Sequence, residues 1–282
     1  MTPQLDITFA RLAHVMLEAQ LETALQGKGP TGPGAFALPA RHRCELGLWL
    51  GQHEPPHALV ERDAYLQLVM AHDQFHDKAE RVIHHLTVTP PTLPPSRLAE
   101  EMAQFRLLSR DMVFLLTSLE LAYLNEQHRS AWLAHPLKNL LHRLFDDHPA
   151  MSSGETEILD ISHARLAHVR WQENLCKSFR HRGRHFPMDA EENCVLGNWV
   201  RNVGLPGHAD LAEMTMLDQA HQQFHAQADK TVQCLQRRQD RRAEQAYAEM
   251  LTASREIVYL LSIIESKLLD AASIHRTPNL IR

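Results

Sequence analysis

Features that would place this chain in several other protein classes are missing from its sequence. It has only four cysteines in 282 residues, too few for a disulfide-stapled scaffold. No apolar run approaches the roughly 20 residues of a membrane-spanning helix. The formal net charge is −5, which argues against the basic surface typical of nucleic-acid binding. The first residues lack the basic and apolar segments of a signal peptide. We therefore expect a soluble, cytoplasmic protein with reduced thiols, no nucleic-acid partner and no membrane insertion.

Strand signals are also scarce, because alternating runs of Val, Ile and Thr are almost absent. Residues of one helix face instead recur at spacings of three and four near the N-terminus, at Ile7, Ala10, His14, Leu17, Leu21 and Ala24. This spacing is typical of a helix that faces the core of a bundle. Further helical stretches follow over residues 44–50, 68–86 and 98–123. We therefore predict an all-α fold, in which Gly27 and the prolines after it end the first helix.

The chain contains an internal repeat. The segments of residues 6–15 and 160–169 are identical at eight of their ten positions, and three later blocks also recur in the same order. These blocks begin at Cys44 and Cys194, at Ala71 and Ala220, and at Arg110 and Arg255. Only the loops between the blocks differ in length, so we interpret the chain as a duplication of one helical unit.

The repeat divides the chain into two predicted domains, residues 1–125 and 159–282, each an antiparallel four-helix bundle. Between them, residues 126–158 form a predicted linker that holds a short amphipathic helix over residues 136–145. That helix either packs on one of the domains or docks a partner. We expect the two domains to pack on each other as an intramolecular pseudo-dimer within a single chain.

Metal-ligating residues stand out among the 20 histidines of the chain. His14 occupies an apolar position of its helix, and His72 and His76 are four residues apart, which places both imidazoles on one helix face. Cys44 lies on another helical stretch and is followed by Gly47, which permits close approach of a neighbouring helix. The same four residue types recur in the second repeat. The candidate metal ligands are therefore His14, Cys44, His72, His76, His168, Cys194, His221 and His225.

One cysteine and three histidines make a closed tetrahedral set, which suits Zn²⁺. We therefore predict two Zn²⁺ ions per chain. A closed set leaves no position for a substrate or an activated water, so we predict no enzymatic activity.

These blocks together resemble the chemoreceptor zinc-binding (CZB) domain family. The resemblance rests on His-Val-Met-Leu from His14, Cys-Glu-Leu-Gly-Leu-Trp from Cys44 and His-Asp-Gln-Phe-His from His72, with their counterparts from His168, Cys194 and His221. It implies a helical bundle that binds zinc through the four residues of each repeat. It also implies a cytoplasmic regulator whose zinc-bound cysteine senses zinc availability or oxidants, a role that falls here on Cys44 and Cys194.

The chain departs from the usual members of that family. It has two copies in one chain, and it lacks a signalling stalk or a cyclase-like Gly-Gly-Asp/Glu-Glu-Phe motif. The resemblance therefore implies a separate partner, a bacterial signalling protein of the chemoreceptor or diguanylate cyclase type. Two other functions stay open from the residues alone. One is a zinc buffer without a partner. The other, less favoured, is a di-iron or hemerythrin-like bundle, which would need carboxylates interleaved with its histidines.

Overall fold

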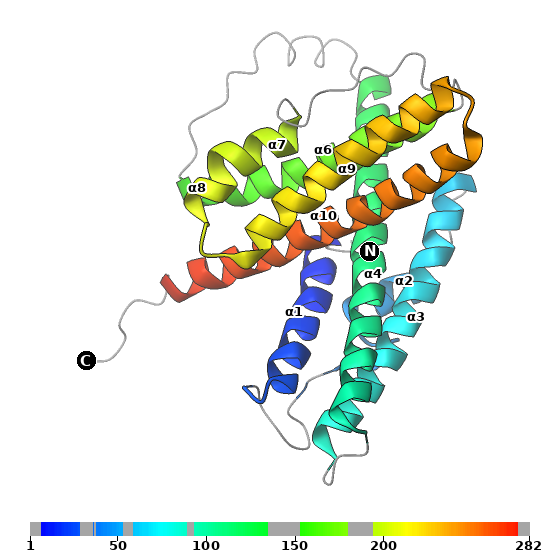
Figure 1. The fold of residues 1–282 in the computed structure, drawn as a ribbon. Helices are drawn as coiled ribbons and strands as arrows, with labels where there is room; N and C mark the ends of the chain where they lie inside the picture. Colours follow the sequence, from blue (N-terminus) through cyan, green and yellow to red (C-terminus); the bar gives the residue numbers. More distant parts are fainter. Residues whose placement is uncertain are drawn as a thin grey trace. The chain divides into compact units, whose positions relative to one another are not determined.

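The predicted all-α fold is confirmed. The computed structural model describes residues 7–28, 36, 38–52, 59–88, 93–134, 153–179 and 194–275, and these contain helices, turns and connecting segments but no strand (Figure 1). The amphipathic segment predicted over residues 136–145 lies outside the described residues. Among the helices that the structure describes, none is long and apolar enough to cross a membrane.

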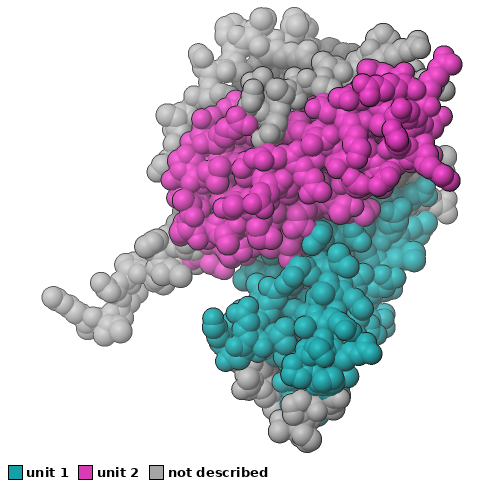
Figure 2. All heavy atoms as spheres, in the orientation of Figure 1, with its two compact units in different colours: residues 1–116 teal, residues 117–282 magenta. Residues whose placement is uncertain are grey.

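The chain divides into two compact units, residues 1–116 and 117–282 (Figure 2). α4 contributes to both, since it runs from Pro95 to Ala134. The domain ends predicted at residues 125 and 159 and the pseudo-dimer packing stay predictions.

Unit 1 is built from α1 (Ile7–Leu25), α2 (Glu45–Gln52), α3 (Leu59–Thr87) and the first part of α4. The apolar seam predicted for α1 is buried at Ala10 and Leu21. Phe75 of α3 packs on Phe105 of α4 with ring centroids 4.6 Å apart. This packing fixes α3, the helix that carries two of the candidate ligands.

Unit 2 repeats this plan with more interrupted elements. After the last part of α4 come α6 (Ser153–Phe179), α7 (Val195–Trp199), the π-helical turn η2 (Val200–Gly204), α8 (Leu205–Gly207), α9 (Ala212–Gln236) and α10 (Asp240–His275). α9 and α10 pack along each other as an antiparallel pair, and α6 packs on α10 (Figure 1). The core between them includes Phe224, Met250 and Ile257, all fully buried.

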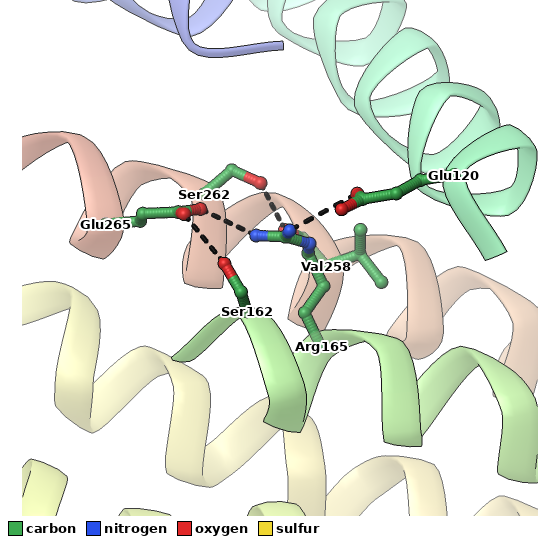
Figure 3. Close-up of polar contacts among 6 residues, drawn as sticks. All are labelled: Glu120, Ser162, Arg165, Val258, Ser262 and Glu265. Carbon is green, nitrogen blue, oxygen red and sulfur yellow. Dashed lines mark hydrogen bonds and ion pairs between the residues drawn. The ribbon is translucent and has the colours of Figure 1, made fainter. Parts of the chain in front are cut away.

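A buried ionic network ties α6 to α10 in unit 2 (Figure 3). Arg165 is fully buried, and its guanidinium donates from Nη1 to Glu265 Oε2 at 2.6 Å. Ser162 Oγ donates to the other oxygen of Glu265 at 2.9 Å, and Glu120 Oε2 of α4 lies 3.4 Å from Arg165 Nη2. A buried guanidinium needs such partners, because desolvating an unpaired charge is very costly.

Candidate metal centres

Unit 1 brings together all four of the residues predicted from its sequence. His14 comes from α1, Cys44 precedes α2, and His72 and His76 come from α3. One ligand atom from each lies within 4.8 Å of the others. Residues that are 62 positions apart at the extremes, from 14 to 76, thus converge on one point in the core of the unit.

His14 is oriented by its own helix. Its Nδ1 lies 2.5 Å from the backbone carbonyl oxygen of Ala10, one turn earlier. Because a carbonyl only accepts, Nδ1 carries the proton and donates, and Nε2 keeps its lone pair. An imidazole whose one nitrogen donates to a backbone carbonyl is the usual arrangement of a metal-bound histidine.

Cys44 is held at the entrance to α2. Its Sγ lies 3.1 Å from His72 Nε2 and accepts a hydrogen bond from the Gly47 backbone N–H at 3.2 Å. Burial raises the pKa of the Cys44 thiol, while the backbone N–H groups at the helix start act in the opposite direction. A bound cation would add to those N–H groups and favour the thiolate.

Gly47 is required at this turn for steric reasons. A Cβ atom at this position would lie 1.7 Å from the carbonyl oxygen of Arg41 and 3.2 Å from His72 Cε1. The close approach expected from the sequence is therefore made mainly by the backbone of the preceding turn, with the ring of His72 behind it.

The electrostatics of this group keep its imidazoles neutral. Burial lowers the pKa of His14 to about 4 and that of His72 to about 3, and neighbouring histidines lower both further. Burial also lowers the pKa of His76. Only a neutral imidazole has a lone pair for a metal, so at neutral pH the three rings are in the form that binds one.

His76 supplies a direct indication that something belongs in this space. Both of its ring nitrogens are buried and have no hydrogen-bond partner among the described residues. Buried polar atoms are almost always satisfied, and a bound metal ion would satisfy one of these nitrogens. The residues present therefore fit a metal ion.

Unit 2 brings together three of its four predicted residues. One ligand atom each from Cys194, His221 and His225 lies within 4.8 Å of the others. Cys194 is the N-cap of α7, accepts from Gly197 N–H at 3.2 Å and lies 3.1 Å from His221 Nε2. Burial lowers the pKa of His221 to about 3, so this ring is also neutral. The thiol-imidazole pair thus has the same contacts as in unit 1.

His168, the fourth residue predicted for unit 2, does not join that group. Its Nε2 lies 3.0 Å from Ser254 Oγ on α10, and Ser254 Oγ in turn donates to Gln172 Oε1. His168 nevertheless lines a cavity of about 120 Å³ together with Cys194, His225, Trp171, Phe224, Ala167, Val195 and Leu196.

Several residues that surround these two sites were not predicted from the sequence. In the aligned repeats Ser254 corresponds to Ser109, and Gln172 corresponds to Glu18. Ser109 Oγ is buried without a hydrogen-bond partner among the described residues, whereas Glu18 lies 3.6 Å from Arg106 Nε. The signal was available, because Ser109 and Ser254 both stand directly before a repeated block.

The molecule therefore contains two buried groups of His and Cys that could hold a metal ion. Neither group includes a carboxylate among the residues that the structure describes. Comparisons with protein-family models, with curated proteins and with solved structures found no match to this chain.

Proposed function

We propose that the protein is a zinc-binding regulatory protein of the chemoreceptor zinc-binding type, with one zinc ion in each unit. His14, Cys44, His72 and His76 would hold the first ion. Cys194, His221 and His225 would hold the second. The observation that carries the proposal is the buried convergence of three neutral imidazoles and one thiol in unit 1, with both nitrogens of His76 unsatisfied among the described residues.

The donor set favours zinc over the other common ions. Calcium and magnesium prefer oxygen ligands, and neither group offers a carboxylate among the described residues. Zinc accepts nitrogen and sulfur donors in a tetrahedral arrangement, which one thiolate and three imidazoles can supply. When bound, zinc would supply positive charge that stabilises the thiolate form of Cys44 and Cys194.

The arrangement of the ligands suits regulation. In unit 1 the ligands come from α1, from the start of α2 and from α3, which are separate helices. Binding would join these elements, and loss of the ion would leave buried imidazoles and a thiol without that constraint. The positions of these helices would therefore depend on whether the metal ion is bound. A separate partner would sense that difference, and we propose that this partner is a bacterial signalling protein.

The same thiols make the response sensitive to oxidants. Cys44 and Cys194 are partly buried rather than fully enclosed. A thiolate at either position would attack a peroxide, take one oxygen atom and release water after protonation of the leaving hydroxide, becoming a sulfenate. A sulfenate is a poorer ligand than a thiolate, so the helices joined at the site would separate.

Elemental analysis and oxidant-triggered zinc release test this function. We expect two zinc ions per wild-type chain, fewer in the Cys44→Ser/Cys194→Ser variant, and no release by peroxide from whatever zinc that variant retains. Cys176→Ser is the matched control, because Cys176 is partly buried but contacts Tyr247 instead of either metal group. Iron in place of zinc, or unchanged metal content in the double variant, would overturn the proposal.

A conformational readout separates a regulator from a zinc buffer. A regulator requires that chelation changes the protein, so amide exchange in α1 should accelerate when zinc is removed and recover when zinc is restored. A buffer would bind and release zinc with no change in exchange beyond the ligands themselves.

A further inference from the structure

We infer that the metal centre of unit 2 keeps one coordination position open to a small exogenous anion or water, whereas the centre of unit 1 is closed by its own residues. This inference rests on the proposed function, because it requires that a metal ion binds in both units. It concerns what the ion of unit 2 can bind in addition to protein.

A chain of two hydrogen bonds holds His168. Ser254 Oγ donates its one proton to Gln172 Oε1, so it can only accept from His168 Nε2, 3.0 Å away. His168 Nε2 therefore carries a proton and has no lone pair for a metal, and neither ring nitrogen of His168 belongs to the group of ligand atoms formed by Cys194, His221 and His225. His168 and Ser254 are both buried, so water does not compete for these bonds.

His14 is held differently from His168. In unit 1 the proton is on Nδ1, which donates to Ala10, and Nε2 is the nitrogen that keeps its lone pair. Ser109, the counterpart of Ser254, makes no hydrogen bond among the described residues. Glu18, the counterpart of Gln172, instead faces Arg106. His14 is thus held by its own helix and belongs to the ligand group of unit 1.

A cavity lies beside two of the three candidate ligands of unit 2. The cavity of about 120 Å³ has Cys194 and His225 on its wall, and its remaining surface includes Trp171, Phe224 and His168. A water molecule needs roughly 10–15 Å³, so the cavity has room for a small ligand beside a bound ion. Trp171 covers His225, with ring centroids 5.3 Å apart.

The charge and the lining of the open coordination position in unit 2 favour a small anion. A divalent ion with one thiolate and two neutral imidazoles keeps a net positive charge, in a pocket whose walls are largely aromatic or aliphatic. Three protein ligands with an open fourth position are also the pattern of zinc sites that bind water or substrate. The ligand class is therefore a hydroxide or a small monodentate anion such as azide or thiocyanate.

Cobalt(II) is the probe, because its visible spectrum reports coordination number and ligand exchange where zinc is silent. Two full-length variants separate the sites. His72→Ala/His76→Ala leaves only the centre of unit 2, and His221→Ala/His225→Ala leaves only the centre of unit 1. We expect azide or thiocyanate to change the cobalt spectrum of the first variant and to leave that of the second unchanged.

The outcomes distinguish this inference from the proposed function. Cobalt bound in both variants with no response to either anion, or with the same response in both, would overturn the open position and leave metal binding intact. Failure of the wild-type chain to bind cobalt or zinc would overturn both. Circular dichroism of each variant establishes that the helical fold is retained.

Single substitutions give a second, independent measurement. His14→Ala should weaken zinc binding in unit 1 by about 100-fold or more, while His168→Ala should change binding in unit 2 by less than about 10-fold. Ser254→Ala should free His168 Nε2, tighten binding and remove the response to azide. Ser109→Ala is the matched control and should change neither. Equal losses in His14→Ala and His168→Ala would contradict the inference.

Discussion

The two units begin with nearly the same ligand motifs and form different candidate metal centres. In unit 1 four ligand atoms lie within 4.8 Å of one another, whereas in unit 2 three do. The distance between the cysteine Sγ and the first histidine of the His-x-x-x-His pair is 3.1 Å in both units. In both units the cysteine also directly precedes a short helix. The two ligand sets differ at the first histidine of each repeat, His14 or His168.

That difference teaches that a ligand motif specifies only which residues are available. Whether a histidine offers its lone pair depends on neighbours that are not ligands. Ser254 donates to Gln172 and so accepts a hydrogen bond from His168 Nε2, whereas Glu18 lies close to Arg106 in unit 1. A change from Glu to Gln one turn away from the histidine accompanies the change in its hydrogen bonding.

The largest effect on this comparison should come from Glu265→Ala. This change removes the closest partner of the fully buried Arg165 and should destabilise unit 2 by about 3–5 kcal/mol, because it leaves a buried charge poorly compensated. We expect the second metal ion to be lost with the fold of α6 while the first is retained. Thermal denaturation with metal analysis measures both.

Ser162→Ala is the matched control for that experiment. It removes one hydrogen bond to the same carboxylate and keeps the Arg165–Glu265 contact, so it should cost only about 1 kcal/mol. Similar losses of stability in Glu265→Ala and Ser162→Ala would show that the ionic contact is not what holds α6 to α10.

The next effect should come from Gly47→Ala, which acts on unit 1 alone. The new Cβ would overlap the Arg41 carbonyl oxygen, and relief of that overlap has to move the turn that carries Cys44. We expect a loss of about 3 kcal/mol in stability and a loss of the first metal ion, with the second unaffected. Gly51→Ala, in the same helix and with open space around it, should have no such effect. Retention of both ions in Gly47→Ala would contradict the tight turn.

The sequence predicted the fold class and the convergence of His14, Cys44, His72 and His76, because helical spacing and the repeat constrain both. It also predicted the end of α1 near Gly27. It did not predict the divergence of His168, since that depends on Ser254, which is 86 residues away along the chain and next to it only in the folded unit. The pairing of Arg165 with Glu265 is of the same kind. Long-range polar partners are set by packing, which local patterns do not encode.

The smallest predicted effect compares how helices end in the two units. Two residues after the end of α1 in unit 1 stands Gly27 at φ 72°, and two residues after the end of α9 in unit 2 stands Arg238 at φ 57°. The residue after each of these positions donates an equivalent hydrogen bond to the last helical turn. Lys28 N donates to Thr23 O at 3.0 Å, and Gln239 N donates to Cys234 O at 2.9 Å. This is the usual left-handed helix end, in which glycine avoids the clash between Cβ and the backbone.

Arg238→Gly should therefore stabilise unit 2 by about 1 kcal/mol, and Gly27→Ala should destabilise unit 1 by a similar amount. Arg238 is exposed, so its side chain loses little packing when it is replaced. Arg237→Gly, at the preceding position where the backbone is not left-handed, is the matched control and should lower stability instead. Chemical denaturation of the zinc-loaded chain measures each change. An equal response to Arg238→Gly and Arg237→Gly would mean that the left-handed geometry at residue 238 carries no strain for glycine to relieve.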